Sequence, residues 1–220
     1  MHRNVLRAGG ARALAALALL LGLPSTAAAL PLISELFYDA VGSDNGHSFV
    51  ELYGAPGASL EGLVLEGVNG AGGAIGPTIV LSGAIPADGF FVVADDQGDG
   101  TTLVAQVDLL ANFDFQNGPD SVVLRSGETI LDALGYGEFA PGDVFAGEGA
   151  AAPDAPPGAS LARRFADLDS DDNAADFWVE ASPTPGTGLL AVPEPATAAS
   201  LGLGLAGLAG LARRSRSRRG

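Results

Sequence analysis

Short runs of alternating apolar and polar residues fill the chain from residue 30 to residue 188, separated by glycine, proline, asparagine and aspartate. Alternation with a period of two, bounded by such turn-forming residues, is typical of β-strands. The pattern predicts eight strands, at Leu32–Tyr38, Ser48–Tyr53, Gly62–Glu66, Thr78–Leu81, Phe90–Ala94, Ser121–Arg125, Thr129–Ala133 and Ser160–Arg164. In Leu103–Phe113 the pattern does not separate helix from strand. Many short strands at this spacing predict an all-β sandwich.

The first 29 residues show a different pattern, in which charged and apolar residues are segregated. Three arginines precede an apolar run at 13–23, and small residues follow it. Ala27 and Ala29 fit the small-residue positions that signal peptidase requires. We therefore expect residues 1–29 to be a signal peptide that is cut before Leu30. The alternative is a permanent N-terminal membrane anchor, for which the apolar run is short.

The end of the chain places an apolar run between prolines and arginines. A linker at 189–195 ends in Pro193, Glu194 and Pro195, and residues 196–212 follow without a charge. As a helix this run would be about 25 Å long, close to the roughly 30 Å of a bilayer core, so it is predicted to be a transmembrane helix. The tail at 213–220 carries five arginines, which are expected to hold the C-terminus in the cytoplasm. They are Arg213, Arg214, Arg216, Arg218 and Arg219.

This order of Pro-Glu-Pro, short apolar span and arginine cluster resembles the PEP-CTERM sorting signal of Gram-negative bacteria. The resemblance covers residues 192–220. It implies recognition by an exosortase, cleavage near Pro-Glu-Pro, and transfer from a transient stay in the inner membrane to the cell surface or extracellular matrix. The alternative is a permanent tail anchor.

Charge narrows the classes of partner. Residues 30–192 hold 25 of the 26 acidic residues, against Arg125, Arg163 and Arg164, which gives a formal charge of −22; the chain has no lysine. Such a surface repels nucleic acid, so we expect no nucleic-acid partner. The chain also has no cysteine, which excludes disulfides, a thiol nucleophile and a lipoprotein acylation site.

Two predicted strands share a pattern of a glutamate between large apolar residues. In ISELF, alternation places Glu35 on one face with Ile33 and Phe37, and in FVELY it places Glu51 on one face with Phe49 and Tyr53. Two such carboxylates could act as acid and base if their environments separate their pKa values. The interpretation that we favour is structural, with each carboxylate accepting backbone hydrogen bonds.

The body of the chain resembles the lamin-tail domain over about residues 31–188. The segments that carry the resemblance are LISELFYDAVGSDNGHSFVELYG, IPADGFFVVADD, NGPDSVVLRSGETILDALGYG and SLARRFADLDSDDNAADFWVEASPTPGTG. The resemblance implies an immunoglobulin-like β-sandwich at residues 30–188. The family has no single established activity, and its bacterial members often accompany nucleases or adhesive modules, so the resemblance implies interaction more than catalysis.

An acidic stretch near the end of the body is a candidate calcium loop. Asp167, Asp169, Asp171, Asn173 and Asp176 offer the oxygen ligands that calcium prefers. The EF-hand template fails, because Ala174 takes the position of its glycine and no flanking helices are expected. The alternative is a solvated loop whose Asp and Asn side chains cap their own turns.

No motif for a hydrolase, nucleotide site or metalloprotease occurs, and His47 is the only histidine of the exported body. We therefore expect a non-enzymatic exported protein without a cofactor, calcium aside. Its expected partners are signal peptidase and exosortase during export, and then an unidentified surface protein or polysaccharide. The alternative is a calcium-dependent adhesion or carbohydrate-binding module that uses the acidic stretch.

Overall fold

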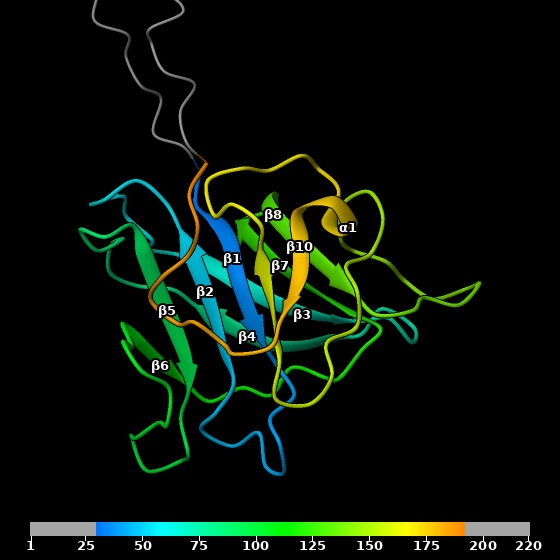
Figure 1. Cartoon of the computed structure of the whole chain (residues 1–220), viewed down its shortest axis with the longest axis horizontal. Coiled ribbons are helices and arrows are strands. Elements are labelled where there is room, and N and C mark those ends of the chain that lie inside the picture. The colour runs from blue at the N-terminus through cyan, green and yellow to red at the C-terminus, as the bar shows by residue number, and fades with distance from the viewer. Residues whose placement is uncertain (1–29, 192–220) are drawn as a thin grey trace, which may run out of the picture.

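The computed structural model describes residues 30–191 (Figure 1). The predicted signal peptide with Ala27 and Ala29 lies outside the described residues, and so do the Pro-Glu-Pro motif, the predicted transmembrane helix and the terminal arginines. Among the helices of the described segment, none is both long and apolar enough to cross a bilayer.

Two β-sheets make up the described segment. The six-stranded sheet has the spatial order β10 (Phe177–Glu180), β9 (Ser160–Arg163), β1 (Leu32–Phe37), β2 (Phe49–Tyr53), β5 (Phe90–Asp95) and β6 (Leu109–Ala111). The four-stranded sheet has the order β4 (Ile75–Val80), β3 (Leu63–Asn69), β7 (Asp120–Ser126) and β8 (Thr129–Tyr136). Neighbouring strands are antiparallel, except for the parallel pair β5 and β6. One short helix, α1 (Asn173–Asp176), precedes β10.

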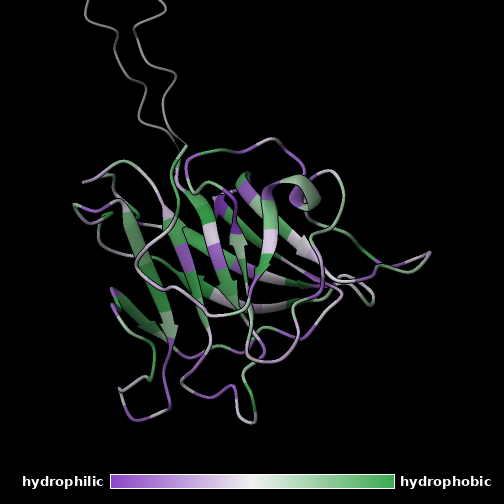
Figure 2. Ribbon diagram, in the orientation of Figure 1, coloured by the Kyte–Doolittle hydropathy of each residue, from purple (hydrophilic) through white to green (hydrophobic). Residues whose placement is uncertain are grey.

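One hydrophobic core joins the two sheets. Val50 and Leu52, alternate residues of β2, are fully buried and belong to the same cluster as Leu65 of the other sheet. Tyr38, which follows β1, stacks on Tyr136 of β8 with ring centroids 4.5 Å apart. Figure 2 shows the strands as mainly hydrophobic, with hydrophilic interruptions on β1 and β2. The predicted all-β architecture with two sheets is thus confirmed.

Each of the eight predicted strands overlaps an observed strand, but three elements were not predicted. The ambiguous segment at 103–113 contains β6, a strand of three residues that pairs with β5. Helix α1 is only four residues long and is capped by the Asp172 side chain, which accepts a hydrogen bond from the Ala174 amide. Strand β10 pairs with β9 along its whole length. Such short elements depend on their neighbours in space, which the local pattern does not reveal.

A β-bulge corrects the predicted faces of β1. The register with β2 shifts between Ile33 and Glu35, so that Ile33 faces the shared core while Phe37 packs on the opposite face with Phe49. The prediction that Ile33 shares a face with Glu35 was therefore wrong. A bulge adds one residue to a strand and reverses the alternation beyond it. Its consequence is that Glu35 lies on the outer face of the six-stranded sheet, opposite Glu51.

Candidate functional site

Two buried carboxylates lie side by side on the outer face of the six-stranded sheet. Glu35 of β1 and Glu51 of β2 are direct cross-strand partners, and each residue is only 1% exposed. Like charges in directly opposite positions destabilise a sheet, and burial of a charge is costly unless hydrogen bonds compensate it. The two carboxylates therefore need hydrogen-bond donors, and other parts of the chain supply these donors.

The donors come from neighbouring serines and from the C-terminal strap, which we define as residues 181–191. Ser34 Oγ donates to Glu51 Oε1 at 2.7 Å, and Ser160 Oγ donates to Glu35 Oε1. From the strap, the Thr184 amide donates to Glu35 Oε1 at 2.9 Å and its hydroxyl donates to Glu35 Oε2 at 2.8 Å. The Gly186 amide donates to Glu51 Oε2 at 2.6 Å. Both glutamates thus serve as anchors for the strap, as the structural interpretation of the pattern required.

The environment shifts the pKa values of both carboxyls upward. Burial raises the pKa of Glu51 to about 8; the hydrogen bonds from Ser34 and Gly186 oppose the shift, and the charge of Glu35 adds to it. Burial also raises the pKa of Glu35, against the hydrogen bonds from Ser160 and Thr184. For both carboxyls, burial is thus the largest influence on the pKa, and the surrounding hydrogen bonds oppose it.

Beyond the glutamates, single hydrogen bonds hold the strap to the body. Figure 1 shows the strap (orange) passing in front of the six-stranded sheet after β10. Gln106 Nε2 donates to the Pro185 carbonyl at 2.9 Å, and the Ala166 amide donates to the Leu189 carbonyl at 2.7 Å. At the end of the strap, the Ala191 amide donates to Asp167 Oδ1 at 2.6 Å. One of the candidate calcium ligands, Asp167, thus binds the strap.

A pocket of about 360 Å³ opens between the strap and strand β10. Glu35 and Glu51 line it, together with Trp178 and Glu180 of β10 and strap residues that include Thr187. Trp178 is 40% exposed, so its ring forms an accessible wall. The pocket combines an aromatic surface with carboxylates and hydroxyls, which suits a small polar ligand.

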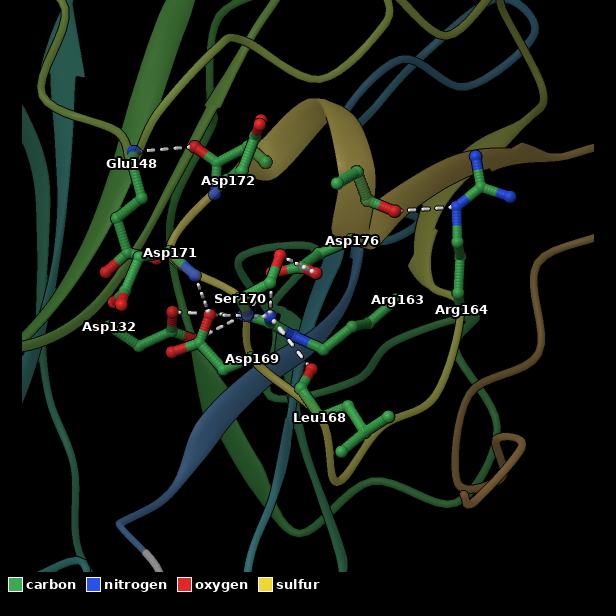
Figure 3. A network of polar contacts seen from close by, with 12 residues as sticks. Asp132, Glu148, Arg163, Arg164, Leu168, Asp169, Ser170, Asp171, Asp172 and Asp176 are labelled. Atoms are coloured by element: carbon green, nitrogen blue, oxygen red, sulfur yellow. Dashed lines mark hydrogen bonds and ion pairs between the residues drawn. The ribbon is translucent and has the colours of Figure 1, made fainter. Parts of the chain in front are cut away.

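A second polar site surrounds Arg163 of β9, which is 4% exposed. Its Nη2 donates to both carboxylate oxygens of Asp132 at 3.0 Å, and its Nη1 donates to Asp176 Oδ2 at 3.0 Å and to Asp169 Oδ1 at 3.2 Å (Figure 3). Its Nε donates to the Ile33 carbonyl at 2.9 Å. Arg163 is therefore an internal cation for three carboxylates. Burial raises the pKa of Asp132, and the charge of Arg163 opposes that shift.

The structure assigns most of the candidate calcium ligands to contacts within the protein. Asp169 and Asp176 meet at Arg163, and Asp176 also accepts hydrogen bonds from the Ser170 amide and hydroxyl. Asn173 is fully buried; its Oδ1 accepts from the Gly135 and Glu148 amides, and its Nδ2 donates to the Ala133 carbonyl. Asp171 is exposed and adopts a positive φ of 55°. These contacts favour a structural role for the loop.

Two carboxylates of this region were missed by sequence reasoning. Oxygens of Asp132, Glu148 and Asp169 lie within 4.8 Å of one another, a grouping that could hold a metal ion. The Oε2 atom of Glu148 is buried and has no hydrogen-bond partner in the described segment. Burial raises the pKa of Glu148 to about 7, and the charges of Asp132 and Asp169 add to the shift. No spacing pattern links these residues, because they come from β8 and two separate loops.

Comparison with known proteins bears on the end of the chain. Residues 191–218 match the family model described as the PEP-CTERM protein-sorting motif. No curated protein and no solved structure matches the chain. The motif begins at Ala191, the residue at which the strap is bound by Asp167. It indicates an exported protein that is directed to exosortase processing and sorted toward the cell surface.

Proposed function

We propose that this protein is a non-enzymatic component of the cell surface or extracellular matrix, in which exosortase sorting delivers a lamin-tail interaction domain. The observation that carries the proposal is the match of residues 191–218 to the sorting motif. On this view the signal peptide directs export, the Pro-Glu-Pro segment is recognised at the inner membrane, and the domain reaches the surface. Its partner there is a surface protein or a polysaccharide.

Two features of the domain support a binding role with an immunoglobulin-like sandwich. The two sheets share one core, as the lamin-tail resemblance requires. The buried carboxylates that resemble an acid and base pair, Glu35 and Glu51, accept hydrogen bonds from serines and from the strap. Both glutamates thus have a structural role within the domain, as anchors of the strap.

Replacement of Glu194 by alanine is expected to stop C-terminal processing, because it removes the only charge of the Pro-Glu-Pro segment. Intact mass spectrometry of cell fractions from the native host measures the outcome. We expect the natural chain to begin at Leu30 and to end near Pro195 in the outer or extracellular fraction. The Glu194→Ala and Pro195→Ala variants should stay in the inner membrane with all five terminal arginines. Glu138→Ala, an exposed change in the domain, serves as the control. Normal processing of both motif variants would refute the proposal.

A second candidate function, calcium-dependent adhesion, is favoured by the grouping of Asp132, Glu148 and Asp169. Carboxylate oxygens are the ligands that calcium prefers, and the buried Oε2 of Glu148 needs a partner. Arg163 already compensates two of these carboxylates, so a bound ion would share them with the guanidinium.

If calcium binds there, it should stabilise the folded protein by about 2.7 kcal/mol at one hundred times its dissociation constant. Thermal unfolding in increasing CaCl₂ measures this, with MgCl₂ at equal ionic strength as the control for screening of the acidic surface. Glu148→Gln should abolish the response. An equal shift with magnesium, or a full response in Glu148→Gln, counts against the calcium function.

A further inference from the structure

The strap has two parts, and the body holds the inner part more strongly than the outer part. Its inner part, Pro183–Gly186, is half-buried and donates to the buried carboxylates of Glu35 and Glu51. Its outer part is exposed; Leu189 and Leu190 are 60% and 44% exposed. Beyond Thr187, whose amide approaches Glu51, the hydrogen bonds between this outer part and the body are those at Leu189 and Ala191 among the described residues. Segments with few buried contacts open locally at low free energy.

The strap also determines how far the sorting motif can reach. When Ala191 is bound, four residues separate it from the apolar run that begins at Ala196. Four extended residues span at most about 14 Å, whereas a domain of this size has a radius of gyration of roughly 15 Å. Release of residues 184–191 would add roughly 26 Å. With the strap bound, the folded body therefore stays close to Pro-Glu-Pro and limits the space for an enzyme.

We propose that the strap is a releasable tether, whose detachment from Asp167, Ala166 and the two glutamates gives exosortase access to the Pro-Glu-Pro segment. This inference rests on the proposed sorting function. Asp167, Glu35 and Glu51 are positioning residues in this mechanism, because they act on the position of the motif and not on the reacting bond. Processing would then be limited by opening of the strap.

A disulfide across the strap tests the tether directly. The chain has no cysteine, so an introduced pair has no competing thiol. A Cβ added at Gly188 would lie 3.5 Å from the Cβ of Ala166, within the range that disulfides require. It would also lie 3.0 Å from the Phe90 ring, which has to shift slightly. The double variant Ala166→Cys/Gly188→Cys thus staples the strap in its bound position.

Pulse-chase labelling of the full chain in its native host gives the rate of conversion to the processed form. We expect the stapled variant to be processed at least tenfold more slowly than either single cysteine variant. Eight Gly and Ser residues inserted after Ala191 should restore processing in the stapled chain, because they supply the missing reach. Asp167→Ala, which removes one hydrogen bond, should speed processing up to about fivefold. The control Asp143→Ala removes a comparable hydrogen bond, which the Ala140 amide donates in another loop, and it should leave the rate of processing unchanged.

The possible failures are distinguishable. If neither the natural chain nor Glu194→Ala is cleaved, the sorting function itself fails. A second outcome is that the natural chain is cleaved and Glu194→Ala is not, which supports the sorting function. If the stapled chain is then processed at the rate of the single cysteine variants, the tether hypothesis is wrong. A stapled chain that the insertion does not rescue also overturns the tether, since its defect would then have another cause.

Discussion

Replacement of Arg163 by methionine is expected to destabilise the domain by about 3–5 kcal/mol at pH 7. The change keeps an apolar stem of similar length but removes the cation that three carboxylates share. Asp132, which is fully buried, would keep only the hydrogen bonds from the Ile33 and Ala133 amides. An uncompensated buried carboxylate is costly, and the loss is a large fraction of the total stability of a typical domain. Urea unfolding followed by the fluorescence of Trp178, the only tryptophan, measures the change.

Two further variants separate loss of the ion pair from loss of an arginine. Arg125 also pairs with a glutamate, Glu66, but at 3.2 Å in a position where its side chain is 29% exposed. Glu66 is itself only 14% exposed, so Arg125→Met should cost more than the loss of a fully exposed pair but clearly less than Arg163→Met. The double variant Arg163→Met/Asp132→Asn should recover at least about 1 kcal/mol, because no unpaired charge remains buried at residue 132. Equal losses for Arg163→Met and Arg125→Met would contradict the assigned role of the cluster.

The two-sheet fold was predictable because alternation survives in most strands. Residues such as Val50 and Leu52 face the core while their neighbours face outward, and the sequence shows this directly. The bulge after Ile33 was not predictable, because it depends on how β1 fits between β2 and β9. Strand β6 has three residues and pairs in parallel with β5, so its pattern alone is too short to identify it.

The polar sites were only partly visible in the sequence, because their contacts join distant residues. The glutamates of ISELF and FVELY were recognised, but the donors at Thr184 and Gly186 lie 149 and 135 residues away from them. Arg163 carried one usable signal, since it is one of three arginines in a strongly acidic body. A rare cation among many carboxylates is expected to be surrounded by them. Nothing in the sequence spacing, however, indicates that Asp132 and Glu148 lie beside it.

The folded protein should become less stable as the pH rises from about 5 to 8, and Glu51→Gln should remove much of that loss. Burial raises the pKa of Glu51 from 4.5 to about 8, so between these values the folded state holds a proton that the unfolded state has released. The free energy of unfolding then falls by about 1.4 kcal/mol per pH unit for this one group. Glutamine keeps an oxygen for the Gly186 amide, and its amide group can donate to Ser34 Oγ. Urea unfolding at half-unit steps of pH measures the slope.

The slope of the natural protein includes other groups, which makes the comparison between variants decisive. Burial also raises the pKa of Glu148 to about 7, so this group adds to the fall in stability over the same pH range. The raised pKa of Glu35 contributes in the same direction. Burial acts to raise the pKa of Asp176, but hydrogen bonds from the Ser170 side chain and amide and the charge of Arg163 outweigh it, so this pKa is lowered. The stability that ionised Asp176 contributes is therefore lost only in more acidic solution. Glu51→Gln should therefore reduce the slope of the free energy of unfolding against pH by about 1.4 kcal/mol per pH unit, the contribution of one proton, and leave a smaller slope from the other groups. It should also be the more stable protein at pH 8, whereas the exposed control Glu138→Gln should follow the natural curve. If Glu51→Gln instead kept the full slope, or unfolded more easily at pH 8, Glu51 would be ionised in the folded state and the strap would be bound by a charged anchor.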